Sequence, residues 1–231
     1  ICSSDLQPLD KALSLLEDCR RYGTLAFAHL ARSAFISVTL LKSAVDQKII
    51  SSSAMQSFLN SIETVANEFI KDAKKVAENE QAWSYFIRRY GHLRPGTYDI
   101  MSETYAGNIE KFLKPVVENS RSDEHDPIET SIEWMNEKEC FFNALNEVGL
   151  IHDADNAEWF LRTAIEGREY AKFVFSRNLS AALDLITEFG EMHGIDRVQM
   201  ANISLGSLFA VRSGNVPSEK VVSFLENESQ S

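Results

Sequence analysis

The chain has 231 residues, of which 44% are hydrophobic and 25% charged, and its formal net charge is -11. This length suits one large domain or two small ones, and the composition is typical of a soluble globular protein. The negative charge disfavours a non-specific nucleic-acid surface, because such binding depends on clustered Lys and Arg. The most apolar stretch, residues 25–45, is interrupted by His29, Arg32 and Lys42. We therefore expect no nucleic-acid partner and no transmembrane segment.

Three widely separated cysteines, Cys2, Cys19 and Cys140, give neither a disulfide framework nor a zinc-binding spacing. This pattern indicates a reducing, cytoplasmic location, and the N-terminal residues carry no signal-peptide pattern. The sequence starts at Ile1 without an initiator methionine. We expect the whole of 1–231 to be a helical fragment of a longer protein.

Helical spacing of apolar residues begins near the N-terminus. A first helix is predicted to end at Gly23, and a second helix over 24–45 is predicted to be capped by Thr24. The second helix is expected to bury one stripe of seven residues, namely Leu25, Ala28, Ala31, Phe35, Val38, Leu41 and Val45.

The pattern continues with a third helix after the serine run 51–53, whose apolar face extends without a break from Phe58 to Val76. A short helix over 83–90 is predicted to end at Gly91. A weakly patterned segment then ends near Pro115. The acid-rich stretch 118–139 is interpreted as solvated surface in preference to an acidic binding surface, and we place a possible subdomain boundary near 115–130.

Helical spacing returns at Ile132 and closes at Gly149. Asp155 or Asn156 is predicted to cap a long helix over 157–190, which Gly167 could bend, and shorter helical pieces follow at 198–211 and 218–225. Neither strand alternation nor hairpin signals occur. The predicted fold is an all-α, multi-helix, mostly antiparallel bundle-like domain with one irregular Gly/Pro loop.

The Gly/Pro loop, residues 90–100, reads Tyr-Gly-His-Leu-Arg-Pro-Gly-Thr-Tyr-Asp-Ile. Gly91 and Gly96 allow backbone angles closed to other residues, and Pro95 fixes its own φ and restricts the residue before it. The loop is therefore expected to have a defined shape, and polar loops of defined shape often carry function.

Two interpretations of the loop chemistry carry equal weight. In the first, His92 serves as an acid or base, Arg94 binds an anion, and Tyr98 and Asp99 orient them. In the second, the loop is structural: Arg94 pairs with Asp99, and His92 bonds to backbone.

Two further polar clusters lie on predicted helices. His29 and Arg32 share one edge of the second helix, where a polar margin is the alternative to a ligand-facing pair. Arg168, Lys172 and Arg177 lie on the long helix and could bind an anion or polar substrate, or form a surface ion-pair ladder. The turn 152–155 is interpreted as a helix cap, and no metal site is assigned.

Three segments resemble the helical middle region of phosphoenolpyruvate-synthase-like phosphotransferases: GTLAFAHLAR at 23–32, YGHLRPGTYDI at 90–100 and GREYAKFVFSRNL at 167–179. The resemblance covers residues 9–211. It implies a parent enzyme that also has an ATP-grasp domain, which uses ATP and Mg²⁺, and a swivelling phosphohistidine domain. In the rifampicin phosphotransferase branch, the helical region binds the small-molecule acceptor.

The resemblance implies that this chain is an acceptor-recognition and interdomain module, with no cofactor of its own and no phosphocarrier residue. The alternative is a non-catalytic structural or docking scaffold, and a free-standing helical enzyme is disfavoured because no nucleophile–base pair is evident. The candidate substrate-binding residues are His29, Arg32, His92, Arg94, Tyr98, Asp99, Arg168, Lys172 and Arg177.

Overall fold

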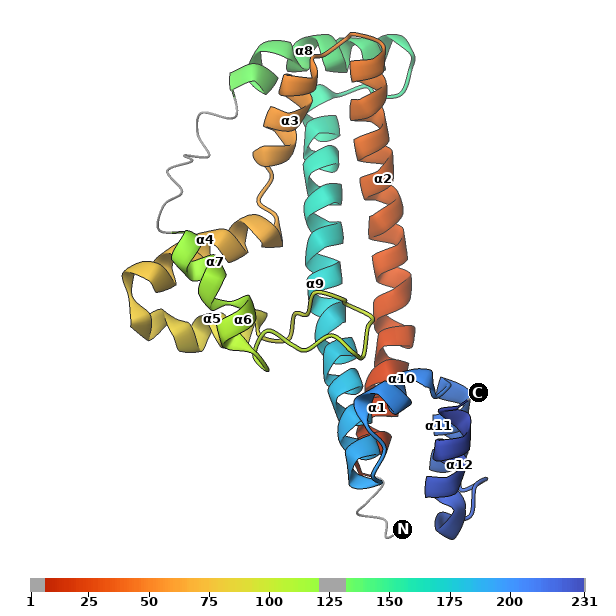
Figure 1. Ribbon diagram of the computed structural model, residues 1–231. Helices are drawn as coiled ribbons and strands as arrows, with labels where there is room; N and C mark the ends of the chain where they lie inside the picture. Colours follow the sequence, from red (N-terminus) through yellow and green to blue (C-terminus); the bar gives the residue numbers. More distant parts are fainter. Residues whose placement is uncertain (1–6, 121–131, 231) are drawn as a thin grey trace. The chain divides into compact units, whose positions relative to one another are not determined.

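The computed structural model describes residues 7–120 and 132–230, and the prediction of an all-α protein is confirmed for them (Figure 1). The α-helices are α1 (Gln7–Asp18), α2 (Thr24–Asp46), α3 (Ser52–Asn60), α4 (Val65–Glu78), α5 (Trp83–Tyr90), α6 (Ile109–Phe112), α7 (Lys114–Asn119), α8 (Ile132–Glu147), α9 (Ala154–Met192), α10 (Arg197–Asn202), α11 (Leu205–Arg212) and α12 (Val221–Glu228). A π-helical turn, Cys19–Gly23, joins α1 to α2, and short 3₁₀ turns precede α5 and α12.

The chain forms two compact units, each assembled from separate stretches of sequence. Unit 1 comprises Ile1–Thr24, Trp83–Pro115 and Val174–Ser231, and unit 2 comprises Leu25–Ala82 and Val116–Phe173. The chain passes between them four times, three times within the helices α2, α7 and α9 and once where a 3₁₀ turn meets α5. Residues 121–130 of the predicted boundary region lie outside the described residues, as does Cys2.

Unit 1 has a core formed by α1, the C-terminal half of α9, and α10 to α12. Its buried residues are Leu9, Ala12, Leu13, Ala182, Ile186, Phe189, Ile195, Met200, Ile203, Leu208, Val211, Val221 and Leu225. In α5, which leads into the Gly/Pro loop, Phe86 and Tyr90 are fully buried, with ring centroids 5.1 Å apart. The start of the loop is therefore fixed by an aromatic anchor.

Unit 2 has a core centred on Trp134, whose ring centroid lies 4.5 Å from that of Phe58 and 5.6 Å from that of Phe141. Helix α3 packs against α8, and α2 runs antiparallel to the N-terminal half of α9 (Figure 1). Apolar residues from α2, α3, α8 and α9 are all represented in this core. Helical periodicity in the sequence therefore reflects real buried faces in this unit.

Glu158 of α9 is the polar centre of unit 2. It accepts hydrogen bonds from the Trp134 indole at 3.1 Å, from Arg162 at 2.8 Å and from Lys138 at 3.2 Å. Partial burial raises the pKa of this carboxyl group, but the three hydrogen bonds outweigh burial and the net pKa is lowered. The carboxylate therefore remains ionised and fixes the position of the central tryptophan.

The predicted helix end at Gly23 is wrong. The chain continues from α1 to α2 through the π-helical turn, and both the amide and the hydroxyl of Thr24 donate to the Cys19 carbonyl, so Thr24 is no N-terminal cap. A Cβ at Gly23 would overlap the ring of Phe175. Gly23 therefore allows α9 to pack closely here and does not end a helix.

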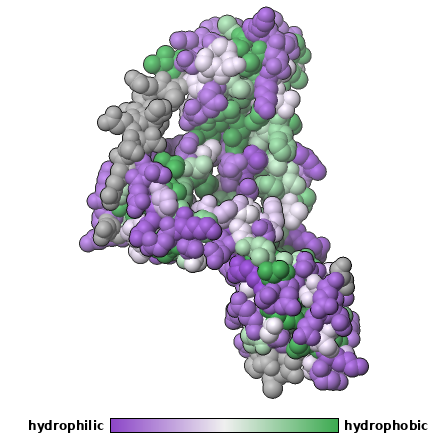
Figure 2. Space-filling view, viewed as in Figure 1, coloured by the Kyte–Doolittle hydropathy of each residue, from purple (hydrophilic) through white to green (hydrophobic). Residues whose placement is uncertain are grey.

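The predicted buried stripe on α2 is only partly confirmed: Leu41 is buried, and Val38 and Val45 pack against the core, but the other buried positions differ. The residues of α2 that are buried are Ala34, Ser37, Leu41 and Ala44, whereas Leu25 is 64% and Phe35 61% exposed. Apolar surface is visible along α2 and α9 within a mostly hydrophilic face (Figure 2). Because α2 is apolar around much of its circumference, spacing alone did not identify the face that packs.

Two other helix boundaries differ from the predictions. The expected third helix is two helices, since Thr64 accepts a hydrogen bond from the Asn67 amide and caps α4 separately from α3. The long helix begins at Ala154, and Asp153 is the residue that caps it, by accepting from the Asn156 amide at 2.9 Å. Side-chain caps therefore set both boundaries, and apolar spacing does not reveal them.

The continuous helix 7–46, which combines α1, the π-turn and α2, is long and apolar enough to cross a membrane. Its most apolar window has a mean hydropathy of 1.4, and 22% of that window is buried. Core helices of soluble proteins meet the same criterion of length and composition. The absence of a transmembrane segment therefore remains a prediction.

Candidate functional site

The connection between α5 and α6, residues 91–108, contains the Gly/Pro loop and is closed by backbone hydrogen bonds at its neck. The Tyr105 amide donates to the Leu93 carbonyl at 2.7 Å, and the Ala106 amide donates to the Gly91 carbonyl at 2.9 Å. A Cβ at Gly91 would overlap the Ile87 carbonyl oxygen. Glycine is therefore required where the chain leaves α5, because a side chain has no room there. The predicted reason, a backbone angle closed to other residues, is wrong, since neither Gly91 nor Gly96 has a positive φ.

Asp99 shapes the tip of the loop. Its carboxylate accepts from the Met101 amide at 2.9 Å, its own amide donates to the Gly96 carbonyl at 3.0 Å, and Ser102 Oγ accepts from the Gly96 amide at 3.0 Å. These local bonds form a tight turn of the kind that aspartate and glycine favour. Tyr98 beside it is 63% exposed.

Arg94 anchors the loop to α9, and its side chain is only 1% exposed. Its guanidinium donates to the Ser180 hydroxyl at 2.8 and 3.0 Å, to the Ser180 carbonyl at 2.9 Å and to the Ser102 carbonyl at 2.9 Å. It also pairs with Asp184 at 3.0 Å. The pairing with Asp99 that the structural interpretation predicted is replaced by this pairing with Asp184, because Arg94 points into α9 while Asp99 is used in the turn.

Arg177 and His92 lie near the base of the same loop in unit 1. Arg177 is exposed and its Nη2 donates to the Arg89 carbonyl, near the C-terminal end of α5, over 3.4 Å. A cation at this position complements the negative end of the helix dipole. His92 is half-buried.

The other four candidate residues, His29, Arg32, Arg168 and Lys172, belong to unit 2. His29 and Arg32 are exposed on α2, and Lys172 is half-buried. Arg168 pairs with its neighbour Glu169 at 2.9 Å and lies 5.6 Å from the centroid of the Phe35 ring. A single pocket formed by all three sequence motifs remains a prediction, because these residues and the loop belong to different units.

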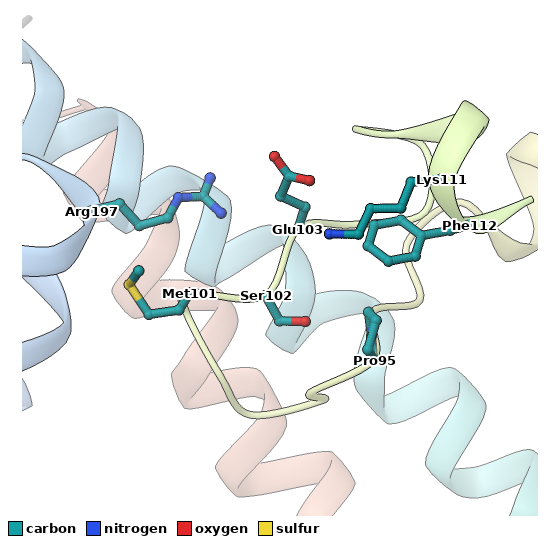
Figure 3. A pocket seen from close by; sticks show the side chains of 7 residues that line it. All are labelled: Pro95, Met101, Ser102, Glu103, Lys111, Phe112 and Arg197. Atoms are coloured by element: carbon teal, nitrogen blue, oxygen red, sulfur yellow. The ribbon is translucent and has the colours of Figure 1, made fainter.

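A cleft of about 680 Å³ lies beside the loop within unit 1 (Figure 3). Its lining residues are Pro95, Met101, Ser102, Glu103, Lys111, Phe112 and Arg197. The side chains of Glu103, Lys111 and Arg197 converge over the loop segment 101–103, with Arg197 on one side and Lys111 on the other (Figure 3). The cleft is therefore bounded by charged groups from three separate parts of the chain.

One wall of this cleft is held by the buried anchor. Ser102 lines the cleft, its carbonyl accepts from Arg94, and its hydroxyl accepts from the Gly96 amide. On the opposite side, Phe112 stacks on Tyr105 with a centroid distance of 5.4 Å. Burial raises the pKa of the Tyr105 phenol, which therefore stays neutral near pH 7. Both walls are thus positioned by contacts made before any ligand is present.

Sequence reasoning did not identify Glu103, Lys111, Phe112 or Arg197 as site residues. Lys111 and Phe112 belong to a four-residue helix that follows the loop, whereas Arg197 is the first residue of α10, which follows α9 in the sequence. No fixed spacing connects these positions, so the sequence contains no local signal for their meeting. Among the described residues, no group of three or more His, Cys, Asp and Glu side chains is arranged to hold a metal ion.

Comparison with known proteins gives no family assignment. No family model matches the chain, and neither the curated proteins nor the solved structures contain a match to it.

Proposed function

We propose that this chain is the acceptor-recognition and interdomain helical module of a phosphoenolpyruvate-synthase-like, ATP-dependent phosphotransferase, and that its small-molecule acceptor occupies the cleft beside the Gly/Pro loop. The parent protein would supply the ATP-grasp domain, with ATP and Mg²⁺, and the swivelling phosphohistidine domain. This chain would contribute recognition and no phosphocarrier.

The observation that carries the proposal is the position of the Gly/Pro loop, the most specific of the resembling segments. Buried Arg94 fixes the loop on α9, and the residues that follow it form a wall of a cleft with two cationic side chains. Arg94 itself is engaged inside the fold. Within unit 1, recognition is therefore assigned to the residues that line the cleft, and Arg94 to holding them in place.

Two measurements test the proposal. The reading frame on both sides of this chain should encode an ATP-grasp region and a histidine-bearing swivelling region. The protein made from that complete frame should transfer phosphate from ATP to a member of a panel of small hydroxylated molecules, and Lys111→Met should lower this transfer. Lys114→Met is the matched control, because Lys114 is exposed, pairs with Glu110 and does not line the cleft.

A second candidate function is a docking scaffold that only positions catalytic domains. It is favoured by the internal engagement of Arg94, which binds Ser102, Ser180 and Asp184 and no open surface. On this alternative, Lys111→Met and Lys114→Met in the complete protein have the same transfer rate as wild type. A rate that falls only in Lys111→Met rejects the scaffold.

A further inference from the structure

The cleft beside the Gly/Pro loop reverses the charge of the protein locally. The whole chain carries a net charge of -11, yet the charged groups lining the cleft are two cations, Lys111 and Arg197, and one anion, Glu103. Clefts lined mainly by one sign of charge raise the local concentration of ions of opposite sign. The cleft is therefore a place in unit 1 where a small anion would be attracted.

Both cations are available to a ligand. Arg197 donates one hydrogen bond, from Nη1 to the Ile100 carbonyl over 3.3 Å, which orients the guanidinium toward the cleft. Lys111 lies with its Nζ 5.0 Å from the centroid of the Phe112 ring. In the part of the chain that the structure describes, neither side chain forms an ion pair, and Glu103 accepts only from the Asn108 amide group at 3.2 Å. An oxyanion between them would thus gain charge-assisted hydrogen bonds from both sides.

Apolar surface adjoins the two cations. Phe112 and Pro95 form one side of the cleft, and Met101, which is 44% exposed, lies on the side of Arg197 (Figure 3). An exposed methionine beside a half-buried aromatic ring is suited to contact an aromatic or alkyl group. A bare inorganic anion would leave these surfaces in water, whereas an anion with an apolar substituent would cover them.

We propose that the cleft binds a small oxyanion, carboxylate or phosphate, that carries an aromatic or alkyl substituent. Lys111 and Arg197 hold the oxyanion, and Met101 and Phe112 contact the substituent. Glu103, between the cations, opposes a second anionic centre and so selects ligands with one charged end. This inference rests on the proposed function, since it names the part of the acceptor that the module recognises. The hydroxyl group that receives the phosphoryl group is a separate part of the same molecule.

The test measures binding to the 231-residue chain by calorimetry, with amide chemical shifts to locate the ligand. Phenyl phosphate is compared with inorganic phosphate, phenylacetate is compared with acetate, and benzyl alcohol serves as the neutral probe. We expect phenyl phosphate or phenylacetate to bind at least about tenfold more tightly than its bare anion and than benzyl alcohol. Shifts should cluster at 101–103, 111–112 and 197, and affinity should fall as salt is raised.

Variants assign the contacts. Lys111→Met and Arg197→Met should each weaken binding of the better phenyl ligand about tenfold, with partial recovery in Arg197→Lys. Glu103→Gln should strengthen it about threefold, because a repelling charge is removed. Met101→Ser should reduce the advantage of the phenyl compound and leave the bare anion unaffected. Lys114→Met, a nearby exposed cation outside the cleft, should change affinity less than about twofold.

Several outcomes overturn the inference: no binding of either phenyl oxyanion at millimolar concentration, equal affinity for benzyl alcohol, equal affinity for the bare anions, or an equal loss in Lys114→Met and Lys111→Met. Its failure is distinct from failure of the proposed function. If the chain binds phenyl phosphate but the complete protein transfers no phosphate, the ligand class is supported and the phosphotransferase function is rejected. If the complete protein transfers phosphate only to neutral acceptors, the phosphotransferase function is supported and the ligand class is rejected.

Discussion

Replacement of Arg94 by methionine tests whether one buried guanidinium holds the loop on α9. Methionine fills much of the same space but cannot donate to the carbonyls of Ser102 and Ser180 or pair with Asp184. A hydrogen bond from a charged group contributes about 1.5 to 3 kcal/mol, and a buried acceptor left unpaired costs about 1 to 3 kcal/mol. Asp184 is 48% exposed, so its share is discounted to about 0.5 kcal/mol. We expect Arg94→Met to lower the free energy of unfolding of unit 1 by about 3 kcal/mol.

The assay combines urea denaturation, followed by circular dichroism, with amide hydrogen exchange at Tyr105 and Ala106. These two amides donate across the neck of the loop, and a loss of about 3 kcal/mol should speed their exchange about a hundredfold if the loop opens with the anchor. Arg88→Met is the matched control, because Arg88 is an exposed arginine of α5 in the same unit, and its cost should stay below about 0.5 kcal/mol.

Two results would refute this reasoning. A cost below about 1 kcal/mol for Arg94→Met would mean that the loop does not depend on its buried anchor. A cost for Asp184→Asn as large as that of Arg94→Met would mean that the ion pair, and not the bonds to Ser102 and Ser180, carries the stabilisation. Arg94→Lys should be intermediate, because an ammonium cannot reproduce the planar fork.

Further predictions concern packing and pH. Gly23→Ala should destabilise unit 1 by about 1 to 3 kcal/mol, because its Cβ would overlap the ring of Phe175. The control Gly206→Ala, whose Cβ would have no atom nearer than 3.5 Å, should be neutral or stabilising. Thermal denaturation of the two variants tests this, and equal melting temperatures would contradict it. The folded pKa of Glu158 is below its ordinary value of 4.5, so the stabilisation is present above that value and is lost as pH falls through the folded pKa. In Glu158→Gln the urea midpoint should therefore fall less on acidification than in wild type, and an identical fall in both proteins would remove Glu158 from this role.

Local signals in the sequence predicted much of the fold. Helix α5 and its end at Gly91 follow from the spacing of Phe86 and Tyr90 and from the glycine itself. By contrast, Gly23 has the same signature in sequence but lies inside a continuous helix, because its missing side chain accommodates Phe175. A glycine that ends a helix and one that permits a close contact look alike until the partner is known.

The loop was recognisable as a candidate site, but the roles of its residues were not. Arg94 looked like an anion-binding group but is buried and holds the loop in place. Asp99 forms the turn, and the ion pair with Arg94 is made by Asp184. Lys111 and Arg197, which lie at the cleft, are separated by the whole of α8 and α9. No periodicity or spacing could have joined them.

The sequence by itself determined the helical class, the approximate helix positions and the existence of one rigid polar loop, because apolar spacing, glycine and proline act over a few residues. Only the tertiary structure decided which face of α2 is buried, which acid pairs with Arg94, and which cations lie beside the loop. These outcomes depend on packing between elements distant in the chain, where burial and hydrogen bonding select one partner among several of the same chemical type.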